Sequence, residues 1–377
     1  MKKQNILKHI AASCLTLLTV CAHAQQLSDP LATAATRNLY KKLHSLKDRY
    51  CIFGHQDDLA YGVQWKYRQG KSDVKDVTQD YPGLYGWDLG HIELDSSRNL
   101  DGIPFSSMKS FIREGYERGG AITISWHFRN PLTGGSAWDT THGAVEAILP
   151  GGAKHELYKS WLDKVAGFIQ DLKGRNGEDI PVLFRPFHEL TGNWFWWCKN
   201  TCSPESFKAL WRFTVTYLRK DKQLHNLILV YNTADYTTEY DFLERYPGDD
   251  VADILSFDMY QFEGQSRELF IKNARHELKI LCDAAKKKNK IAAFAETGYE
   301  AIPDPQWWTR VLMPAIKGYP VSYVLVWRNA GYMESIKKMH YYAPYSKQVS
   351  AADFRKMYNS GKFLFGKGAR NKKIYQP

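Results

Sequence analysis

Two glutamates, Glu189 and Glu296, stand in sequence surroundings that could support chemistry. Residues 184–197 read Phe-Arg-Pro-Phe-His-Glu-Leu-Thr-Gly-Asn-Trp-Phe-Trp-Trp, so Glu189 has a cation, an imidazole and several aromatic rings close by. An isolated glutamate is more often exposed or ion-paired, but this density of rings is hard to explain as core packing. Two carboxylates roughly 5 to 5.5 Å apart can act as proton donor and nucleophile on a glycosidic bond, with retention of configuration.

The elements that must position this pair are short apolar runs separated by helical patterns. The predicted strands are 51–54, 83–87, 121–126, 181–184, 226–231, 254–257, 291–294 and 321–327. This repeated alternation predicts an α/β fold, a closed (β/α)8 TIM barrel in one domain over residues 25–377, and the lack of a Gly-x-Gly-x-x-Gly or Walker-type loop agrees. Chemistry in such barrels gathers at the carboxyl ends of the strands, where Glu189 and Glu296 would face each other.

Two connecting segments carry clear helical patterns. One predicted apolar stripe consists of Leu157, Trp161, Val165, Phe168 and Leu172. The other helix is predicted to begin at Ser203, a capping residue followed by Pro204, and to bury Phe207, Leu210, Trp211 and Leu218. Trp161 and Trp211 are therefore predicted to be core residues.

The remaining strand ends carry polar or aromatic side chains suited to a binding site. They are His55, Asp57, Asp58, His91, Glu93, Trp126, His127, Asp258, Tyr260 and Trp327. The alternation from His91 to Asp95, and His55 with Asp57, also raises metal binding, but no closed ligand set is evident, and we expect neither metal nor cofactor. A serine hydrolase is disfavoured because no Gly-x-Ser-x-Gly motif occurs.

Residues 184–197, together with 257–260 (Phe-Asp-Met-Tyr), 295–298 (Ala-Glu-Thr-Gly) and 326–327 (Val-Trp), resemble glycoside hydrolase family 26 of clan A. Its best-known members are bacterial β-mannanases, and the resemblance runs through most of the chain. It implies that Glu189 is the acid/base and Glu296 the nucleophile. His188 stands where many clan A families have asparagine, in agreement with family 26.

The resemblance also implies that Tyr260 contacts the nucleophile and that Trp194 and Trp327 flank the scissile bond. Physically, nearby apolar rings should desolvate Glu189 and raise its pKa, while Arg185 and Tyr260 can orient Glu296. We further expect His188, Asp258, Trp126, His127 and His91 to bind substrate, with Glu189 as a second possible partner of His188. The segment 129–142 is predicted to form a loop over the cleft. The twelve tryptophans suit a sugar ligand, because pyranose rings stack on indole faces.

The resemblance points to β-1,4-mannosidic linkages in mannan, glucomannan or galactomannan, cleaved internally or with release of mannobiose. One alternative is another β-linked polysaccharide, xylan or mixed-linkage glucan. The other is a carbohydrate-binding barrel without catalysis, which the presence of both carboxylates disfavours.

Residues 1–24 have the layout of a secretory signal, with early lysines, an apolar stretch and Ala-His-Ala before Gln25. We expect an exported protein, periplasmic or secreted, or lipid-anchored if Cys21 is acylated. Loss of three leader lysines lowers the formal charge from +11 to +8, and the basic residues are dispersed, so no nucleic-acid partner is expected. No later segment is apolar enough to predict a membrane span.

Four cysteines follow the leader. Cys198 and Cys202 are close enough in sequence for a local disulfide in an oxidising compartment. Cys51 and Cys282 lie in apolar patterns and are predicted to pack in the core.

Overall fold

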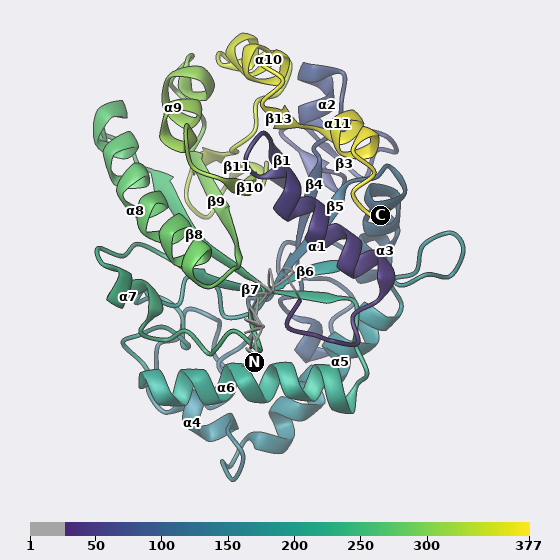
Figure 1. Ribbon diagram of the computed structural model, residues 1–377, viewed down its shortest axis with the longest axis vertical. Helices are drawn as coiled ribbons and strands as arrows, with labels where there is room; N and C mark the ends of the chain where they lie inside the picture. The colour runs from purple at the N-terminus through teal and green to yellow at the C-terminus, as the bar shows by residue number, and fades with distance from the viewer. Residues whose placement is uncertain (1–26) are drawn as a thin grey trace, which may run out of the picture.

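The computed structural model describes residues 27–377, so the predicted leader lies outside the described residues. Eight strands pair in parallel in chain order, and the last pairs with the first, which closes the sheet (Figure 1). They are β1 (Cys51–Gln56), β4 (Leu84–Asp88), β5 (Ala121–Ser125), β6 (Val182–Arg185), β7 (Leu227–Thr233), β8 (Ile254–Gln261), β9 (Ile291–Tyr299) and β10 (Val321–Val326). The predicted (β/α)8 barrel is confirmed, and each strand begins within one residue of its predicted start.

Helices surround the barrel (Figure 1), and the first of them packs Leu39, Tyr40 and Leu43 into the same buried cluster as the barrel interior. They are α1 (Ala34–Leu46), α2 (Asp73–Thr78), α3 (Phe105–Glu117), α4 (Ala144–Ile148), α5 (His155–Gln170), α6 (Pro204–Thr216), α7 (Glu239–Leu243), α8 (Arg267–Lys287), α9 (Met313–Ile316), α10 (Ala351–Asn359) and α11 (Gly366–Asn371). The short 3-10 helix η1 (Ile92–Leu94) and the π-helical segments η2 (Tyr217–Asp221) and η3 (Trp308–Leu312) join them. Hairpins β2 (Tyr61–Gly62) with β3 (Trp65–Lys66) and β11 (Gly331–Met333) with β12 (Lys338–His340) extend the loops after β1 and β10, and β13 (Phe363–Leu364) pairs with β1.

Apolar side chains fill both faces of the barrel wall. One buried cluster lies inside the barrel and includes Ile52, Leu183 and Ile228, while a larger one joins the strands to helices such as α5 and α6. Strands buried on both faces appear in the sequence as continuous apolar runs, which is why their positions were predictable.

The first described residues cover the amino ends of the strands. The amide of Ser28 donates to Oδ1 of Asp253, just before β8, at 2.7 Å, and the amide of Thr33 donates to the carbonyl of His225, just before β7, at 2.8 Å. Leu27 joins the apolar cluster of the barrel interior. The chain therefore enters at the end of the barrel opposite the carboxyl ends of the strands.

The predicted start of α6 is confirmed. The Ser203 hydroxyl accepts a hydrogen bond from the amide of Ser206 at 3.0 Å, and Pro204 occupies the first helical position. The buried side of α6 includes the predicted Trp211, which has no exposed surface.

The stripe predicted for α5 is wrong at one end. Leu157 is 38% exposed, and its neighbour Tyr158 is fully buried instead. The hydroxyls of Tyr158 and Thr214 share a hydrogen bond of 2.7 Å. The helical phase places position 158, rather than 157, on the same side as Trp161 and Val165, which are buried as predicted.

The local disulfide that the spacing of Cys198 and Cys202 left open is not formed, since both are free thiols. The Cys198 thiol contacts the carbonyl of Glu189 at 3.4 Å, whereas the Cys202 thiol contacts carbonyls of its own loop. Closeness in sequence therefore does not by itself give the two cysteines the geometry that a disulfide requires. Cys51 and Cys282 are buried, as predicted.

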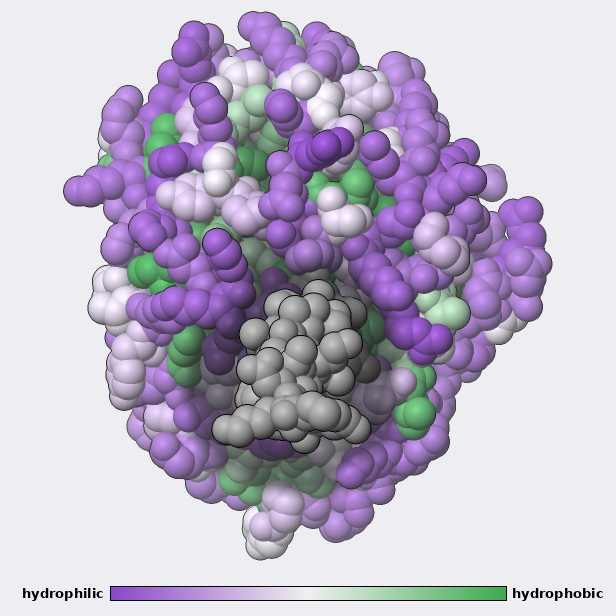
Figure 2. Space-filling model, viewed as in Figure 1, coloured by the Kyte–Doolittle hydropathy of each residue, from purple (hydrophilic) through white to green (hydrophobic). Residues whose placement is uncertain are grey.

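The surface is mainly hydrophilic on the face seen in Figure 2, where apolar residues form only separated areas. Within residues 27–377, no helix is both long and apolar enough to cross a membrane.

Replacing Ser203 with alanine should lower the free energy of unfolding by about 1 kcal/mol, because an amide in the first turn of α6 loses its cap. Chemical denaturation measures the change. The matched control is Ser45→Ala, which removes an exposed serine hydroxyl from within α1 and should cause no comparable loss. Equal losses in both variants would contradict the capping role.

Candidate active site

The loop after β6 presents Glu189 at the mouth of the barrel. The backbones of Phe187 and Glu189 have φ angles of 53° and 55°, in the left-handed region that residues with a Cβ rarely adopt. The side chain of Asn232, near the end of β7, accepts a hydrogen bond from the amide of Glu189 at 2.8 Å. The neighbouring strand thus helps to hold a strained turn, a feature typical of functional sites.

Two donors orient Glu296 near the carboxyl end of β9. Nη2 of Arg185 pairs with its Oε1, and the hydroxyl of Tyr260 donates to its Oε2 at 2.7 Å. Burial and the nearby Glu296 raise the pKa of Tyr260 well above its usual value, so its hydroxyl keeps the hydrogen that it donates. The contacts expected of Arg185 and Tyr260 are therefore present.

Asn232 connects the two sides of the site, and sequence reasoning did not include it. Its Oδ1 accepts from Nη1 of Arg185 at 3.1 Å and from the amide of Glu189, while its Nδ2 donates to Oδ1 of Asp258 at 2.8 Å. The available signal was its position as a polar residue at the end of the fifth barrel strand. One amide side chain thus links the backbone of Glu189 to Arg185, which in turn pairs with Glu296.

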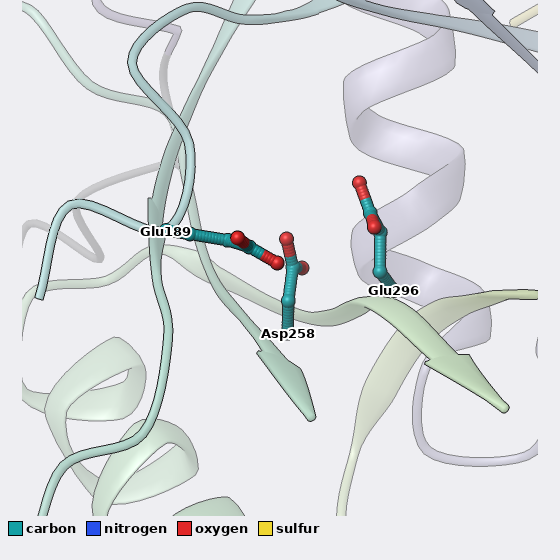
Figure 3. A group of neighbouring side chains, drawn as sticks. All are labelled: Glu189, Asp258 and Glu296. Carbon is teal, nitrogen blue, oxygen red and sulfur yellow. The ribbon is translucent and has the colours of Figure 1, made fainter. Parts of the chain in front are cut away.

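Three carboxylates gather at this point, as Figure 3 shows for Glu189, Asp258 and Glu296. One oxygen from each can be chosen so that all lie within 4.8 Å of one another. Such a group could hold a cation, but Nη1 of Arg185 already donates to Asp258 at 2.7 Å and Nη2 pairs with Glu296. The guanidinium therefore supplies the positive charge that two of the three carboxylates require.

Glu189 has the environment of a proton donor. Burial, followed by repulsion from Glu296, raises the pKa of Glu189 to about 7. The indole Nε1 of Trp194 donates to its Oε2 at 2.6 Å and partly opposes this rise by stabilising the charged form. Near neutral pH, Glu189 can both give and accept a proton.

Exposed aromatic rings border the carboxylates. Trp194 is 39% exposed, and Trp327 is half-buried after β10. Trp138, which sequence reasoning did not single out, is 52% exposed and stacks on His127 with ring centroids 5.3 Å apart. Trp138 lies in the segment 129–142, the predicted loop over the cleft. An aromatic residue in such a loop was the sequence signal that could have identified it.

The prediction that Trp126 contacts substrate is wrong, since this ring has no exposed surface. It stacks on Phe128 with centroids 3.9 Å apart, and its Nε1 donates to Glu93 at 3.2 Å. Successive side chains of a strand point to opposite faces, so Trp126 turns outward where His127 turns toward the mouth. Asp258 was also expected to meet substrate, but its side chain has no exposed surface, and it instead supports Arg185.

The histidines lie at different depths. The rings of His127 and His188 are in contact, with their Nε2 atoms 2.9 Å apart, and both are buried. His91 is half-buried, at a backbone φ of 76°, beside the mouth.

The residues considered for a metal make other contacts. Glu93 accepts from the amide of Arg129 at 2.9 Å, and Nδ1 of His55 lies 2.8 Å from Oδ1 of Asp58. The Tyr61 hydroxyl donates to Asp57 at 2.5 Å. In the part of the chain that the structure describes, these residues form no joint ligand cluster.

The comparisons with known proteins agree with this geometry. The model of glycosyl hydrolase family 26 matches residues 28–342. Among solved structures, a GH26 β-mannanase from Bacteroides ovatus is 46% identical, with a TM-score of 0.87 over 92% of this chain and 98% of that one. The catalytic domain of an endo-β-1,4-mannanase from Bacillus sp. JAMB-750 is 31% identical, with a TM-score of 0.85 over 93% and 96%.

Curated relatives include a mannan endo-1,4-β-mannosidase of Bifidobacterium adolescentis, 30% identical over 90% of this chain and 35% of the relative. A mannan endo-1,4-β-mannosidase of Thermothelomyces thermophilus is 30% identical over 74% of this chain and 54% of the relative. The chain thus spans about a third to a half of the length of these two relatives.

Replacing Trp194 with phenylalanine should raise the pKa of Glu189 above about 7, because the charged carboxylate loses the indole donor. NMR titration of ¹³C-labelled glutamate carboxyls measures the shift, and Glu189→Gln identifies the signal. Trp161→Phe, on α5, is the matched control and should leave the pKa of Glu189 unchanged. An unchanged or lowered pKa in the Trp194 variant would contradict the assigned hydrogen bond.

Proposed function

The chain belongs to glycosyl hydrolase family 26, and on this premise we propose that it hydrolyses β-1,4-mannosidic linkages in mannan, glucomannan or galactomannan. The observation that carries the proposal is the close approach of Glu189 and Glu296, whose nearest carboxylate oxygens lie within 4.8 Å. This separation suits a retaining glycosidase, because an inverting one needs roughly 6.5 to 9.5 Å between its carboxyls to admit a water. The similar proteins named as mannanases support the substrate.

In the first step, protonated Glu189 donates its proton to the glycosidic oxygen while a Glu296 oxygen attacks the anomeric carbon. The bond to the leaving sugar breaks and a glycosyl ester forms on Glu296. Arg185 and Tyr260 orient Glu296 for this attack.

In the second step, Glu189 removes a proton from the water that attacks the anomeric carbon, and the ester bond to Glu296 breaks. Esterification removes the negative charge of Glu296, and with it the repulsion that raises the pKa of Glu189. The pKa of Glu189 therefore falls when it must act as a base. One residue can serve both steps because its partner changes charge between them.

Trp194, Trp138 and Trp327 offer indole faces on which pyranose rings can stack around the carboxylates. A polymer could bind along these rings and be cut internally or to mannobiose. Xylan or mixed-linkage glucan is the second candidate substrate within the same chemistry.

We also propose that the protein is exported, to the periplasm or beyond, by the leader at residues 1–24. Acylation of Cys21 would instead anchor it to a membrane through lipid.

Glu296→Ala should lower kcat on mannohexaose by a factor on the order of 10⁴ or more, because no nucleophile remains. Glu189→Ala should lower it by roughly 10² to 10⁴, and less on an aryl β-mannoside whose leaving group needs no proton. Initial rates measure both effects, and ¹H NMR of the first product should show the β anomer.

The control for these variants is Glu114→Gln, a partly exposed glutamate on α3 paired with Arg118, which should keep full activity. Full activity of either active-site variant would refute the mechanism. Faster turnover of xylohexaose than of mannohexaose would assign the second candidate substrate. Binding of manno-oligosaccharides without any product would leave only a binding protein.

Expression of the full chain in a Gram-negative bacterium should yield exported protein that begins at Gln25, because cleavage follows Ala-His-Ala. Mass spectrometry of the amino-terminal peptide tests this, with Ala24→Pro as the variant that should block cleavage. An acylated Cys21 at the amino terminus would show that the exported protein is lipid-anchored. Protein that keeps residues 1–24 and stays in the cytoplasm would refute export.

A further inference from the structure

A row of three buried polar side chains leads from β4 to the residue before Glu189. Oδ2 of Asp88 lies 2.7 Å from Nδ1 of His127, and Nε2 of His127 lies 2.9 Å from Nε2 of His188. Their exposed fractions are 0%, 9% and 1%. Because the two Nε2 atoms are within hydrogen-bonding distance, one must carry a hydrogen and the other must not.

The contacts of Asp88 require an ionised carboxylate. Its Oδ1 accepts from the amides of Gly90 at 2.7 Å and His127 at 3.2 Å, and its Oδ2 accepts from the Ser125 hydroxyl at 2.6 Å. The Ser125 hydroxyl also lies 3.3 Å from the carbonyl of Trp87, but its contact with Asp88 is the shorter one. With His127 Nδ1 as the fourth donor, these groups together occupy the acceptor positions of an ionised carboxylate. Burial alone would raise the pKa of Asp88, but His127 and these donors lower it to about 2.

A buried carboxylate needs a positive partner, since an unpaired buried charge is costly. Within residues 27–377, His127 is the basic side chain paired with Asp88. The carboxylates of Glu296 and Glu189 also act on His127, and Asp101 interacts with it. Each of these carboxylates favours the imidazolium form, and the contacting ring of His188 would oppose it only if that ring were also protonated.

The two rings differ in basicity for physical reasons. Burial opposes the charged form of His127, but Asp88 outweighs it and the pKa of His127 is raised. Burial, then His127 and Arg185, lower the pKa of His188 well below its usual value. The charge therefore rests on His127, and His188 is neutral.

We propose that Asp88 is a positioning residue that keeps one extra proton on the His127–His188 pair. His127 then donates from Nε2, so His188 accepts at Nε2 and carries its hydrogen on Nδ1. If the extra proton were lost while Nδ1 of His127 still donated to Asp88, the hydrogen bond between the rings would reverse its direction. His188 would then donate from Nε2, and its Nδ1 would become an acceptor. Asp88, which does not itself face the mouth, thus acts on the ring next to Glu189 through the charge that it keeps on His127.

The inferred state has two consequences for the site. Nδ1 of His188 is buried and has no partner in the described part of the chain, so no protein group there competes for the hydrogen that it carries. The cation on His127 also lowers the pKa of Glu189, against the burial that raises it. The second consequence affects turnover only if the proposed function is right.

NMR of protein labelled with ¹⁵N-histidine tests the proton positions without substrate, between about pH 6 and 8 where imidazoles titrate. We expect wild-type His127 to carry hydrogen on both nitrogens and His188 on Nδ1 alone. In Asp88→Asn the side-chain oxygen should keep the amides of Gly90 and His127, so Nδ2 faces Nδ1 of His127. His127 should then be neutral with its hydrogen on Nε2, and His188 should keep its hydrogen on Nδ1. A neutral His127 in the wild type would overturn the proposal even if the variant failed to fold.

The pH dependence of kcat/KM provides the second readout. In Asp88→Asn the cation on His127 is lost, so the pKa of Glu189 should rise. The pH at which kcat/KM falls on the alkaline side, the alkaline limb, should therefore increase by a few tenths of a unit to about one unit. A merely structural role for Asp88 would lower the rate but leave the limb and the ¹⁵N signals in place, and that result would also overturn the proposal.

The matched control is Asp80→Asn, another buried carboxylate that accepts backbone amides, at the amino end of β4. It should leave the histidine signals and the limb unchanged. A wild-type protein with the expected ¹⁵N signals but no hydrolysis of mannan would refute the proposed function and keep the proton assignment.

Discussion

The guanidinium of Arg185 is buried at the mouth of the barrel between Asp258 and Glu296, and the site depends on this pairing. Charges taken out of water are stabilised only by well-aligned opposite charges and hydrogen bonds. Asp258 receives further bonds from Asn232, and Glu296 from Tyr260. These partners lie on β6 to β9 or directly after them, so the charge arrangement requires four consecutive strands in correct register.

The two glutamates differ because only one of them belongs to this charge network. Glu296 receives Arg185 and Tyr260, whereas Glu189 receives one indole and the repulsion of its partner. Equal side chains thereby acquire unequal affinity for a proton. The proposed retaining mechanism needs this inequality, which follows from the strand end that each residue occupies.

The barrel could be predicted from sequence because its strands are buried on both faces and are separated by helical patterns. Glu189, Glu296, Arg185 and Tyr260 could be found because they stand in a dense motif or at strand ends, with family resemblance assigning the roles. Trp126 was assigned to the wrong face because adjacent positions at a strand end point in opposite directions.

Most of the other differences between prediction and structure depend on contacts between residues distant in sequence. Asn232 and Asp88 act through hydrogen bonds to residues distant in sequence, which no spacing reveals. Trp138 sits on a loop whose path depends on tertiary contacts, such as the bond from the Trp196 amide to the Ala137 carbonyl at 3.1 Å. The Cys198 and Cys202 thiols were close in sequence, but the local backbone directs them to different carbonyls.

The hydrogen bond from Ser28 to Asp253 holds the start of the described chain at the amino end of the barrel, opposite the end that carries the candidate active site. Whatever is joined ahead of Leu27, whether a solid support, a fused module or a lipid, would attach behind the barrel, away from the strand ends that carry Glu189 and Glu296. A tethered copy would then hold its mouth outward, and a long polysaccharide could reach it without steric interference from the tether.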